Sequence, residues 1–304
     1  MPPASTSETG RPALRSYLAL ALAALFWSGN FVVGRAVQGR IPPIGLAFWR
    51  WTVALLLVVP FALGAVWRER RALLRAWPVL VALGVLGVGN FNMLVYVGLG
   101  DTTATNALLL QSACPAFIVA LSPAFGAGRA SGRQLAGIAV SLAGVVTILT
   151  RGAPAALGEL ALGGGDLWVL AAVVSWSLYT LLLERRPAVE PRALLAATMA
   201  VGVAWMAPFH AFEAARGARI ALDGVTAAAV AYVAVFASVL AYLLWNAGVA
   251  GVGAGRAGPF LHLMPAFGSL LSVLFLGESL RPYHAAGIGL VLAGVWLATG
   301  RAFR

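Results

Sequence analysis

Apolar stretches of about 18–25 residues recur along the whole chain, separated by short segments that hold the charged and turn-forming residues. A helix of about 20 residues spans the roughly 30 Å hydrocarbon core of a bilayer. The stretches therefore predict ten transmembrane helices, at residues 17–37, 43–66, 77–99, 103–124, 133–151, 166–184, 191–212, 222–248, 256–277 and 283–301.

The composition supports a bilayer as the second solvent. Hydrophobic residues make up 61% of the chain and charged residues 10%, whereas soluble proteins have roughly 45–50% and about 25%. A soluble domain of this length cannot bury so much apolar surface, so the expected class is an all-α, multi-pass protein of the cell (inner) membrane.

The net charge of +11 comes from arginine, since the chain contains no lysine. The arginines are scattered between apolar blocks and form no basic stripe, which argues against a nucleic-acid partner. Placing both termini in the cytoplasm puts about 14 arginines on the inner side and about 6 on the outer side, as the positive-inside rule favours. The single cysteine, Cys114, excludes an intrachain disulfide and suggests a packed thiol, and no cofactor or metal site is expected.

The sequence repeats itself at an offset of about 150 residues. Pro115-Ala116-Phe117 matches Pro265-Ala266-Phe267, and Leu142-Ala143-Gly144-Val145 matches Leu292-Ala293-Gly294-Val295. Five predicted helices per repeat is an odd number, so the second half should enter the membrane from the opposite side. We therefore expect two inverted five-helix repeats at 17–152 and 160–301, preceded by a disordered cytosolic tail at 1–16.

These segments resemble the EamA-type members of the drug/metabolite transporter superfamily. The likeness rests on Leu25-Phe26-Trp27-Ser28-Gly29-Asn30-Phe31, on Phe48-Trp49-Arg50, and on the stretch from Pro265 through Gly277-Glu278 to Val295. Gly126-Ala127-Gly128-Arg129 departs from it, because the family often has a Gly-Glu turn there. The resemblance implies a ten-helix transporter of small metabolites, similar to the amino acid exporters that include the aromatic amino acid exporter.

Polar side chains at bilayer depth are costly, so each needs a structural or functional reason. They either bond helix to helix or line a solute cavity. Trp27 and Trp176 lie too deep for the interfacial aromatic belt, so they either pack or form cavity walls. The residues predicted to contact solute are Trp27, Asn30, Asn92, Tyr96, Gln111, Ser112, Trp176, Tyr179, Tyr242, Asn246 and His262.

Pro115 and Pro265 occupy matching places in the two halves and should bend their helices, which makes them predicted hinges. His262, three residues before Pro265, is also a candidate proton carrier. Arg50 lies well inside a span and either snorkels outward or pairs with a substrate carboxylate or a helix end.

Eight acidic residues fall at span ends or in loops, and none of them lies mid-membrane, which disfavours proton-coupled export of cationic drugs. They are Asp101, Glu159, Asp166, Glu184, Glu190, Glu213, Asp223 and Glu278. The leading hypothesis is an uncoupled secondary transporter for small solutes, with amino acids as the expected cargo, that works by alternating access and is not an enzyme. Alternatives are a nucleotide-sugar or sugar-phosphate exchanger, which needs more cavity cations, and a membrane enzyme or structural subunit. A monomer is compatible with the sequence, as is a dimer contact through the glycine-rich faces of 133–151 and 283–301.

Overall fold

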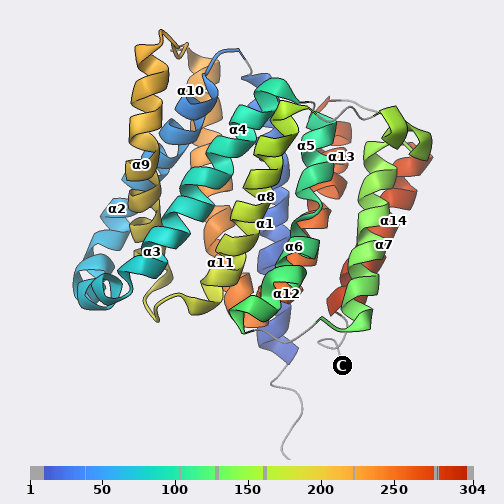
Figure 1. The fold of residues 1–304 in the computed structure, drawn as a ribbon, viewed down its shortest axis with the longest axis horizontal. Coiled ribbons are helices and arrows are strands. Elements are labelled where there is room, and N and C mark those ends of the chain that lie inside the picture. The colour runs from blue at the N-terminus through green and yellow to red at the C-terminus, as the bar shows by residue number, and fades with distance from the viewer. Residues whose placement is uncertain are drawn as a thin grey trace, which may run out of the picture.

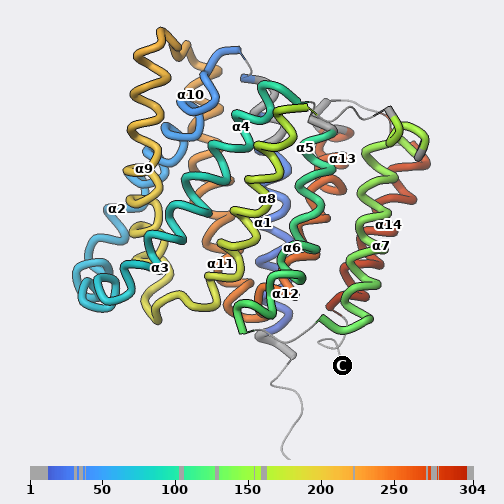
Figure 2. Tube along the Cα trace, in the orientation of Figure 1, coloured from blue at the N-terminus to red at the C-terminus, as the bar shows by residue number. Residues whose placement is uncertain are grey.

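The computed structural model describes residues 10–37, 39–102, 104–126, 130–159, 163–221, 223–276, 279 and 281–299. Within these ranges the chain is helical, with no β-strand (Figures 1 and 2). Its first half contains α1 (Gly10–Ala36), α2 (Pro43–Arg75), α3 (Trp77–Leu83), η1 (Gly84–Asn90), α4 (Phe91–Asp101), α5 (Ala104–Gln111), α6 (Cys114–Leu121), η2 (Ser122–Phe125) and α7 (Gly132–Leu149).

The second half continues the same pattern of long helices with interruptions. After the short η3 (Pro154–Glu159) it contains α8 (Gly164–Leu182), η4 (Leu183–Arg185), α9 (Pro191–Ala215), α10 (Gly224–Tyr232), η5 (Val233–Leu240), α11 (Ala241–Val252), α12 (Ala254–Ala257), η6 (Gly258–His262), α13 (Leu263–Leu276) and α14 (Pro282–Thr299). The start of α1 and the end of α14 lie at the same end of the bundle (Figure 1).

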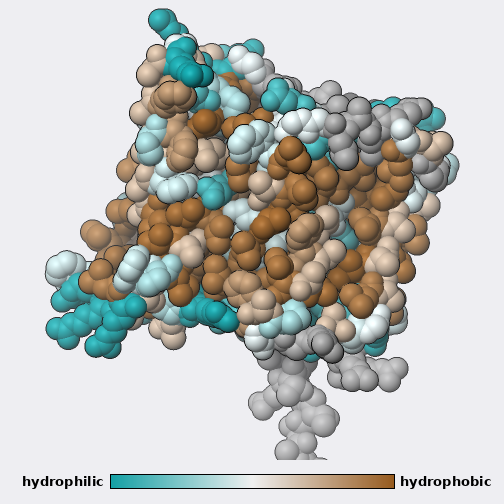
Figure 3. Space-filling model, viewed as in Figure 1, coloured by the Kyte–Doolittle hydropathy of each residue, from teal (hydrophilic) through white to brown (hydrophobic). Residues whose placement is uncertain are grey.

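Eight helical stretches in the described part are long and apolar enough to cross a membrane: Pro43–Arg75, Trp77–Asp101, Asn106–Phe125, Gly132–Leu149, Gly164–Arg185, Pro191–Ala215, Gly224–Val252 and Pro282–Thr299. The other two predicted spans, 17–37 and 256–277, coincide with α1 and with the run from α12 to α13. Figure 3 shows a broad hydrophobic belt between hydrophilic ends. Exposed Leu56, Phe61 and Leu63 on α2 contribute to this outer surface, which suits contact with lipid.

Two boundary predictions are corrected by the structure. The tail predicted to be disordered over 1–16 is too long, because α1 already begins at Gly10, with Pro12 in its first turn where no intrahelical donor is required; residues 1–9 lie outside the described ranges. The predicted span 43–66 ends too early, because Arg68-Glu69-Arg70-Arg71, which the prediction leaves between two spans, belongs to α2. Arginine, glutamate and leucine are strong helix formers and carry the helix on to Arg75.

The helices of the outer pair α2 and α9 run antiparallel and are tied together at both ends. At one end the carboxylate of Glu213 accepts the backbone N–H groups of Ile44 and Gly45, at 3.1 and 2.7 Å. At the other end the carboxylate of Glu69 accepts the backbone N–H of Glu190 at 2.9 Å. Each acid thus satisfies donors that a helix N-terminus leaves without an intrahelical partner.

The pair α7 and α14 stands at one side of the bundle (Figure 1) and is held in contact by glycine. A Cβ added at Gly144 would lie 2.6 Å from the carbonyl oxygen of Gly287, and one added at Gly294 would lie 2.6 Å from that of Gly137. No side chain fits at these positions, so glycine allows the two backbones to approach closely, as in other membrane helix pairs.

Candidate solute cavity

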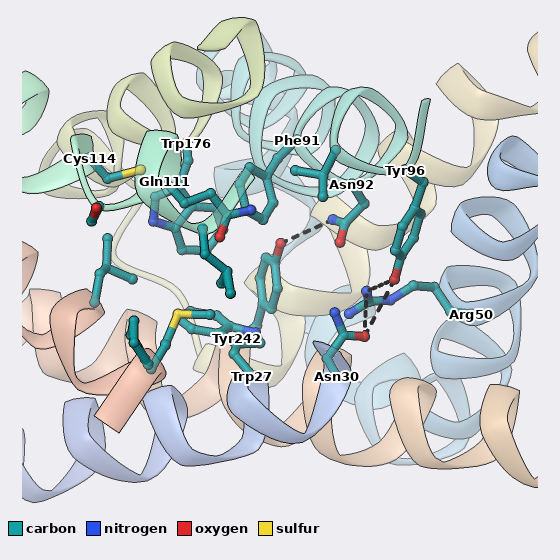
Figure 4. Close-up of a pocket in the computed structure, with 16 residues that line it drawn as sticks. Trp27, Asn30, Arg50, Phe91, Asn92, Tyr96, Gln111, Cys114, Trp176 and Tyr242 are labelled. Atoms are coloured by element: carbon teal, nitrogen blue, oxygen red, sulfur yellow. Dashed lines mark hydrogen bonds between the residues drawn. The ribbon is translucent and has the colours of Figure 1, made fainter. Parts of the chain in front are cut away.

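A cavity of about 50 Å³ lies in the centre of the bundle, where helices of both halves meet (Figure 4). Eight of the eleven predicted solute contacts line it. The complete lining is Trp27, Asn30, Arg50, Phe91, Asn92, Val95, Tyr96, Leu108, Gln111, Ser112, Cys114, Trp176, Tyr242, Leu261, Met264 and Pro265.

Aromatic rings form much of the wall. The rings of Trp27 and Trp176 meet edge to face at a centroid distance of 5.1 Å, and Trp27 contacts Tyr242 in the same way at 5.8 Å. Phe91 lies 4.7 Å from Trp176. The sequence left open whether Trp27 and Trp176 pack in the bundle or form cavity walls. Both are buried, and both line the cavity.

The aromatic side chains are oriented by backbone groups of two π-helical segments, η1 and η5. Trp27 Nε1 donates to the carbonyl oxygen of Ala237 in η5 at 2.9 Å, and the Tyr242 hydroxyl donates to that of Gly87 in η1 at 2.6 Å. Asn92 Nδ2 donates to the carbonyl oxygen of Val88 at 3.1 Å. π-Helical turns alter the regular backbone bonding, and they occur frequently at functional sites.

Arg50 is the cation of the cavity, and its side chain does not snorkel outward. It is 1% exposed. Its Nε donates to Ser238 Oγ at 2.9 Å, and its Nη1 donates to Tyr96 Oη at 2.8 Å and to Asn30 Oδ1 at 3.3 Å. Figure 4 shows Arg50, Asn30 and Tyr96 clustered at one end of the lining.

His262 does not line the cavity, although it was predicted to contact solute. It is fully buried, with Nε2 2.8 Å from the carbonyl oxygen of Ser112 and Nδ1 2.6 Å from Ser141 Oγ. Because a carbonyl only accepts, Nε2 carries the proton and Nδ1 accepts from Ser141 in the neutral ring. His262 therefore ties η6 to the break between α5 and α6 and to α7.

Tyr179 and Asn246 also lie outside the lining. The Tyr179 hydroxyl donates to Asn246 Oδ1 at 2.7 Å, and the Tyr179 ring packs against Trp176 with centroids 5.0 Å apart. Both residues are buried, so they form a second layer that supports the wall.

Both prolines border interruptions of their helices. Pro115 is the second residue of α6, which follows the turn at residues 112–113, and Pro265 is the third residue of α13, which follows the 3₁₀ segment η6. The two interruptions touch, because a Cβ added at Gly258 in η6 would lie 3.3 Å from Pro115 Cα. Their role as hinges stays a prediction.

Sequence reasoning missed the apolar part of the lining and did not select Arg50 as a cavity residue. The missed apolar residues are Phe91, Val95, Leu108, Cys114, Leu261 and Met264. An apolar side chain at a cavity is indistinguishable in one sequence from one that faces lipid. Arg50 did carry a signal, because it is a charged residue deep inside a span.

The groups that line the cavity can form hydrogen bonds and aromatic contacts. The described lining contains amides, hydroxyls, aromatic rings and one guanidinium, with no carboxylate. Among the residues whose positions the structure gives, no cluster of three metal-ligating side chains occurs. A helical bundle with an apolar belt and an internal polar and aromatic cavity defines a multi-pass membrane protein.

The chain belongs to the EamA-like transporter family, whose sequence profile matches residues 14–150 and again residues 163–300. It is similar to the uncharacterized transporter YyaM of Bacillus subtilis, at 28% identity over 94% of each chain. It is 28% identical to a probable terminal-alkyne amino-acid exporter of Streptantibioticus cattleyicolor (93% of each chain) and 28% identical to a probable amino-acid metabolite efflux pump of Salmonella typhimurium (92% of this chain and 93% of that one).

A solved crystal structure shares the fold, with a TM-score of 0.78 at 23% identity, covering 95% of this chain and 98% of that one. The protein is thus a multi-pass membrane transporter of the EamA family and resides in the cell membrane.

Proposed function

We propose that this protein is a secondary transporter that exports small metabolites, with amino acids, including aromatic and apolar ones, as its cargo. The observation that carries the proposal is the central cavity, walled by aromatic rings and neutral polar groups with a single cation. Such a lining suits a zwitterion with an apolar side chain. Two relatives, a probable terminal-alkyne amino-acid exporter and a probable amino-acid metabolite efflux pump, favour the same cargo.

We further propose that the two halves are inverted repeats of five transmembrane helices each, with both termini in the cytoplasm. Gly137 and Gly144 correspond to Gly287 and Gly294 at an offset of 150 residues, and their contacts are reciprocal: Gly144 meets Gly287, and Gly294 meets Gly137. A contact that is unchanged when the halves are exchanged is what a two-fold relation produces.

The centre of the bundle supports the same relation. Asn92 and Tyr242, 150 residues apart, are within hydrogen-bond distance at 3.4 Å, and Trp27 packs on Trp176, its counterpart at an offset of 149. The two π-helical segments, η1 and η5, also occupy matching places. The cavity would then lie at the repeat interface, where inverted-repeat transporters bind solute.

The size of the cavity supports alternating access. Its volume of about 50 Å³ is small beside the roughly 300–1,000 Å³ of typical small-molecule sites. An amino acid enters only if the walls separate. The interruptions beside Pro115 and Pro265, and the segments η1 and η5, are the places where one half can move against the other.

Export is proposed to be uncoupled, because the described lining offers no carboxylate to carry a proton, and because His262, which lies outside the lining, is engaged by Ser112 and Ser141. The rival cargo, a nucleotide sugar or sugar phosphate, carries more negative charge than Arg50 alone matches. Phosphorylated solutes are therefore expected to compete poorly.

The test is flux through purified protein in proteoliposomes loaded with a labelled amino acid. We expect saturable counterflow that persists without a pH gradient and in the presence of a protonophore. Gln111→Ala combined with Trp27→Ala should abolish it, while Gly289→Ala, on the open side of α14, should not. Absence of flux for every amino acid would reject the proposal, and collapse of flux by the protonophore would reject uncoupled export.

A further inference from the structure

Arg50 is a buried cation whose hydrogen-bond partners are all neutral. Ser238 and Tyr96 supply hydroxyls and Asn30 supplies an amide oxygen. The ion pairs between carboxylates and arginines in the described chain lie away from Arg50. They join Asp223 to Arg40, and Glu190 to Arg68 and Arg192. Within the residues that the structure places, no carboxylate lies within ion-pair distance of Arg50.

A cation held in the middle of a membrane protein without a counter-ion is costly, and such residues typically mark a solute or ion pathway. The guanidinium retains binding capacity, because its Nε and Nη1 donate to the three neutral groups while its Nη2 has no acceptor in the described structure. A carboxylate accepts from guanidinium N–H groups more strongly than a neutral oxygen does.

We propose that Arg50 binds the carboxylate of the transported solute, so that the protein takes carboxylate-bearing solutes and discriminates against their amides and amines. This inference rests on the proposed function. The neutral partners hold the guanidinium in place without neutralising it. Ser238 lies in the π-helical segment η5, which links the site to one of the interrupted helices.

The arrangement of the other lining residues suggests how the bound solute would be oriented. Figure 4 shows Arg50, Asn30 and Tyr96 at one end, Tyr242 in the middle, and Trp176, Gln111 and Cys114 towards the other end. The carboxylate would lie at the Arg50 end and an apolar side chain among the rings. Trp176 Nε1 is buried and has no hydrogen-bond partner within the described residues, so the lining offers a second free donor.

The competing explanation is a purely structural Arg50 that joins α2 to α1, α4 and η5 through its three neutral partners. Replacing Arg50 can destabilise the fold under either explanation, so the stability of a variant does not separate them. They differ in one readout, because only the second makes the wild-type protein distinguish a carboxylate from an amide of the same shape.

The experiment compares ligands on the wild-type protein. The twenty amino acids are screened by thermal shift, and the best ligand is then compared with its primary amide and its decarboxylated amine, in binding and in counterflow. We expect the dissociation constants of the amide and the amine to be at least about tenfold higher, because a carboxylate accepts hydrogen bonds from a guanidinium more strongly than a neutral amide does and the amine has no acceptor at that position.

Variants sharpen the assignment. Arg50→Gln should bind the amino acid and its amide equally, whereas Arg133→Gln, at an exposed site on α7, should keep the wild-type preference. If Arg50→Gln does not fold, the comparison of amino acid, amide and amine on the wild-type protein still tests the assignment. Equal binding of amino acid and amide by the wild-type protein overturns the Arg50 assignment while amino-acid transport stands. A protein that neither binds nor moves any amino acid overturns the proposed function and this assignment together.

Discussion

The α7–α14 pair and the helices around the cavity differ in the regularity of their backbones. In α7 and α14 the helices are uninterrupted, and Gly137, Gly144, Gly287 and Gly294 bring backbone against backbone. Around the cavity the helices are interrupted by η1, η5, η6 and the turn after α5. We therefore propose that α7 and α14 form a fixed support and that the interrupted segments around the cavity rearrange during transport. Close backbone packing resists deformation, whereas π-helical turns alter the regular hydrogen bonding of a helix.

The largest effect is expected from placing a side chain in the α7–α14 contact. In Gly294→Ala the new Cβ would meet the Ser141 nitrogen at 2.3 Å, and backbone cannot move aside as a flexible side chain can. We expect a destabilisation of about 3 kcal/mol, at the upper end for overpacking. The measurement is thermal denaturation in detergent, with Gly289→Ala on the same helix as the matched control, since nothing lies within 4 Å of its Cβ. Equal stability of the two variants would show that the contact is not close.

A smaller effect is expected where a side chain binds a π-helical carbonyl. Tyr242→Phe removes the hydroxyl that donates to Gly87 O at 2.6 Å and leaves that buried acceptor with a weaker set of partners. The expected loss of stability is about 1–3 kcal/mol. Because Tyr242 lines the cavity, amino-acid counterflow should fall by a larger fraction in Tyr242→Phe than in Gly294→Ala. A loss of stability with unchanged flux would separate the contact between Tyr242 and Gly87 from transport.

A substitution of His262 tests whether this residue has a structural role or contacts the solute. Because the ring bridges Ser112 and Ser141 and lies outside the lining, His262→Gln should reduce stability by about 1–3 kcal/mol through unpaired buried groups. Solute affinity of the folded variant should stay within about twofold of the wild type, measured by thermal shift with the same amino acid. A tenfold loss of affinity at unchanged stability would return His262 to the set of solute contacts.

The smallest effect is expected at the membrane surface, where Glu190 joins α2 to α9. Hydrogen bonds from Arg192 and then Arg68 lower the pKa of Glu190 from its ordinary value of 4.5. A lowered pKa in the folded state means that the contribution to stability is present above the ordinary pKa and is lost as pH falls through the folded-state pKa. Melting temperatures of wild type and Glu190→Gln should therefore differ slightly at pH 7 and converge as the pH falls through the lowered folded-state pKa of Glu190. A constant difference across this range would contradict the ion-pair account.

The sequence predicted the parts of the fold that depend on local hydropathy. The long apolar runs located the helices, and the deep Trp27 and Trp176, together with the amide and hydroxyl of Gln111 and Ser112, led to cavity residues. The same reasoning placed His262 at the solute, because a polar residue beside a proline reads alike whether it faces a cavity or a second helix. Its actual partner, Ser141, is 121 residues away.

The π-helical segments could not be predicted for the same physical reason. Nothing in Gly84–Asn90 distinguishes a π-helix from an α-helix in the sequence, since the carbonyl groups are satisfied by tertiary partners such as Tyr242. Arg50 was visible as an unusual charge, but its neutral shell of Asn30, Tyr96 and Ser238 comes from three separate elements. Contacts of this range follow from the assembled bundle.

The most direct test of alternating access at the central cavity is the accessibility of one lining position from each side of the membrane. Gln111→Cys in a Cys114→Ala background is reacted with a membrane-impermeant thiol reagent applied to the inside or the outside of sealed vesicles. We predict reaction from both sides, with the balance between sides shifted by a transported amino acid. Reaction from one side alone, unchanged by any amino acid that the protein binds, would contradict alternating access.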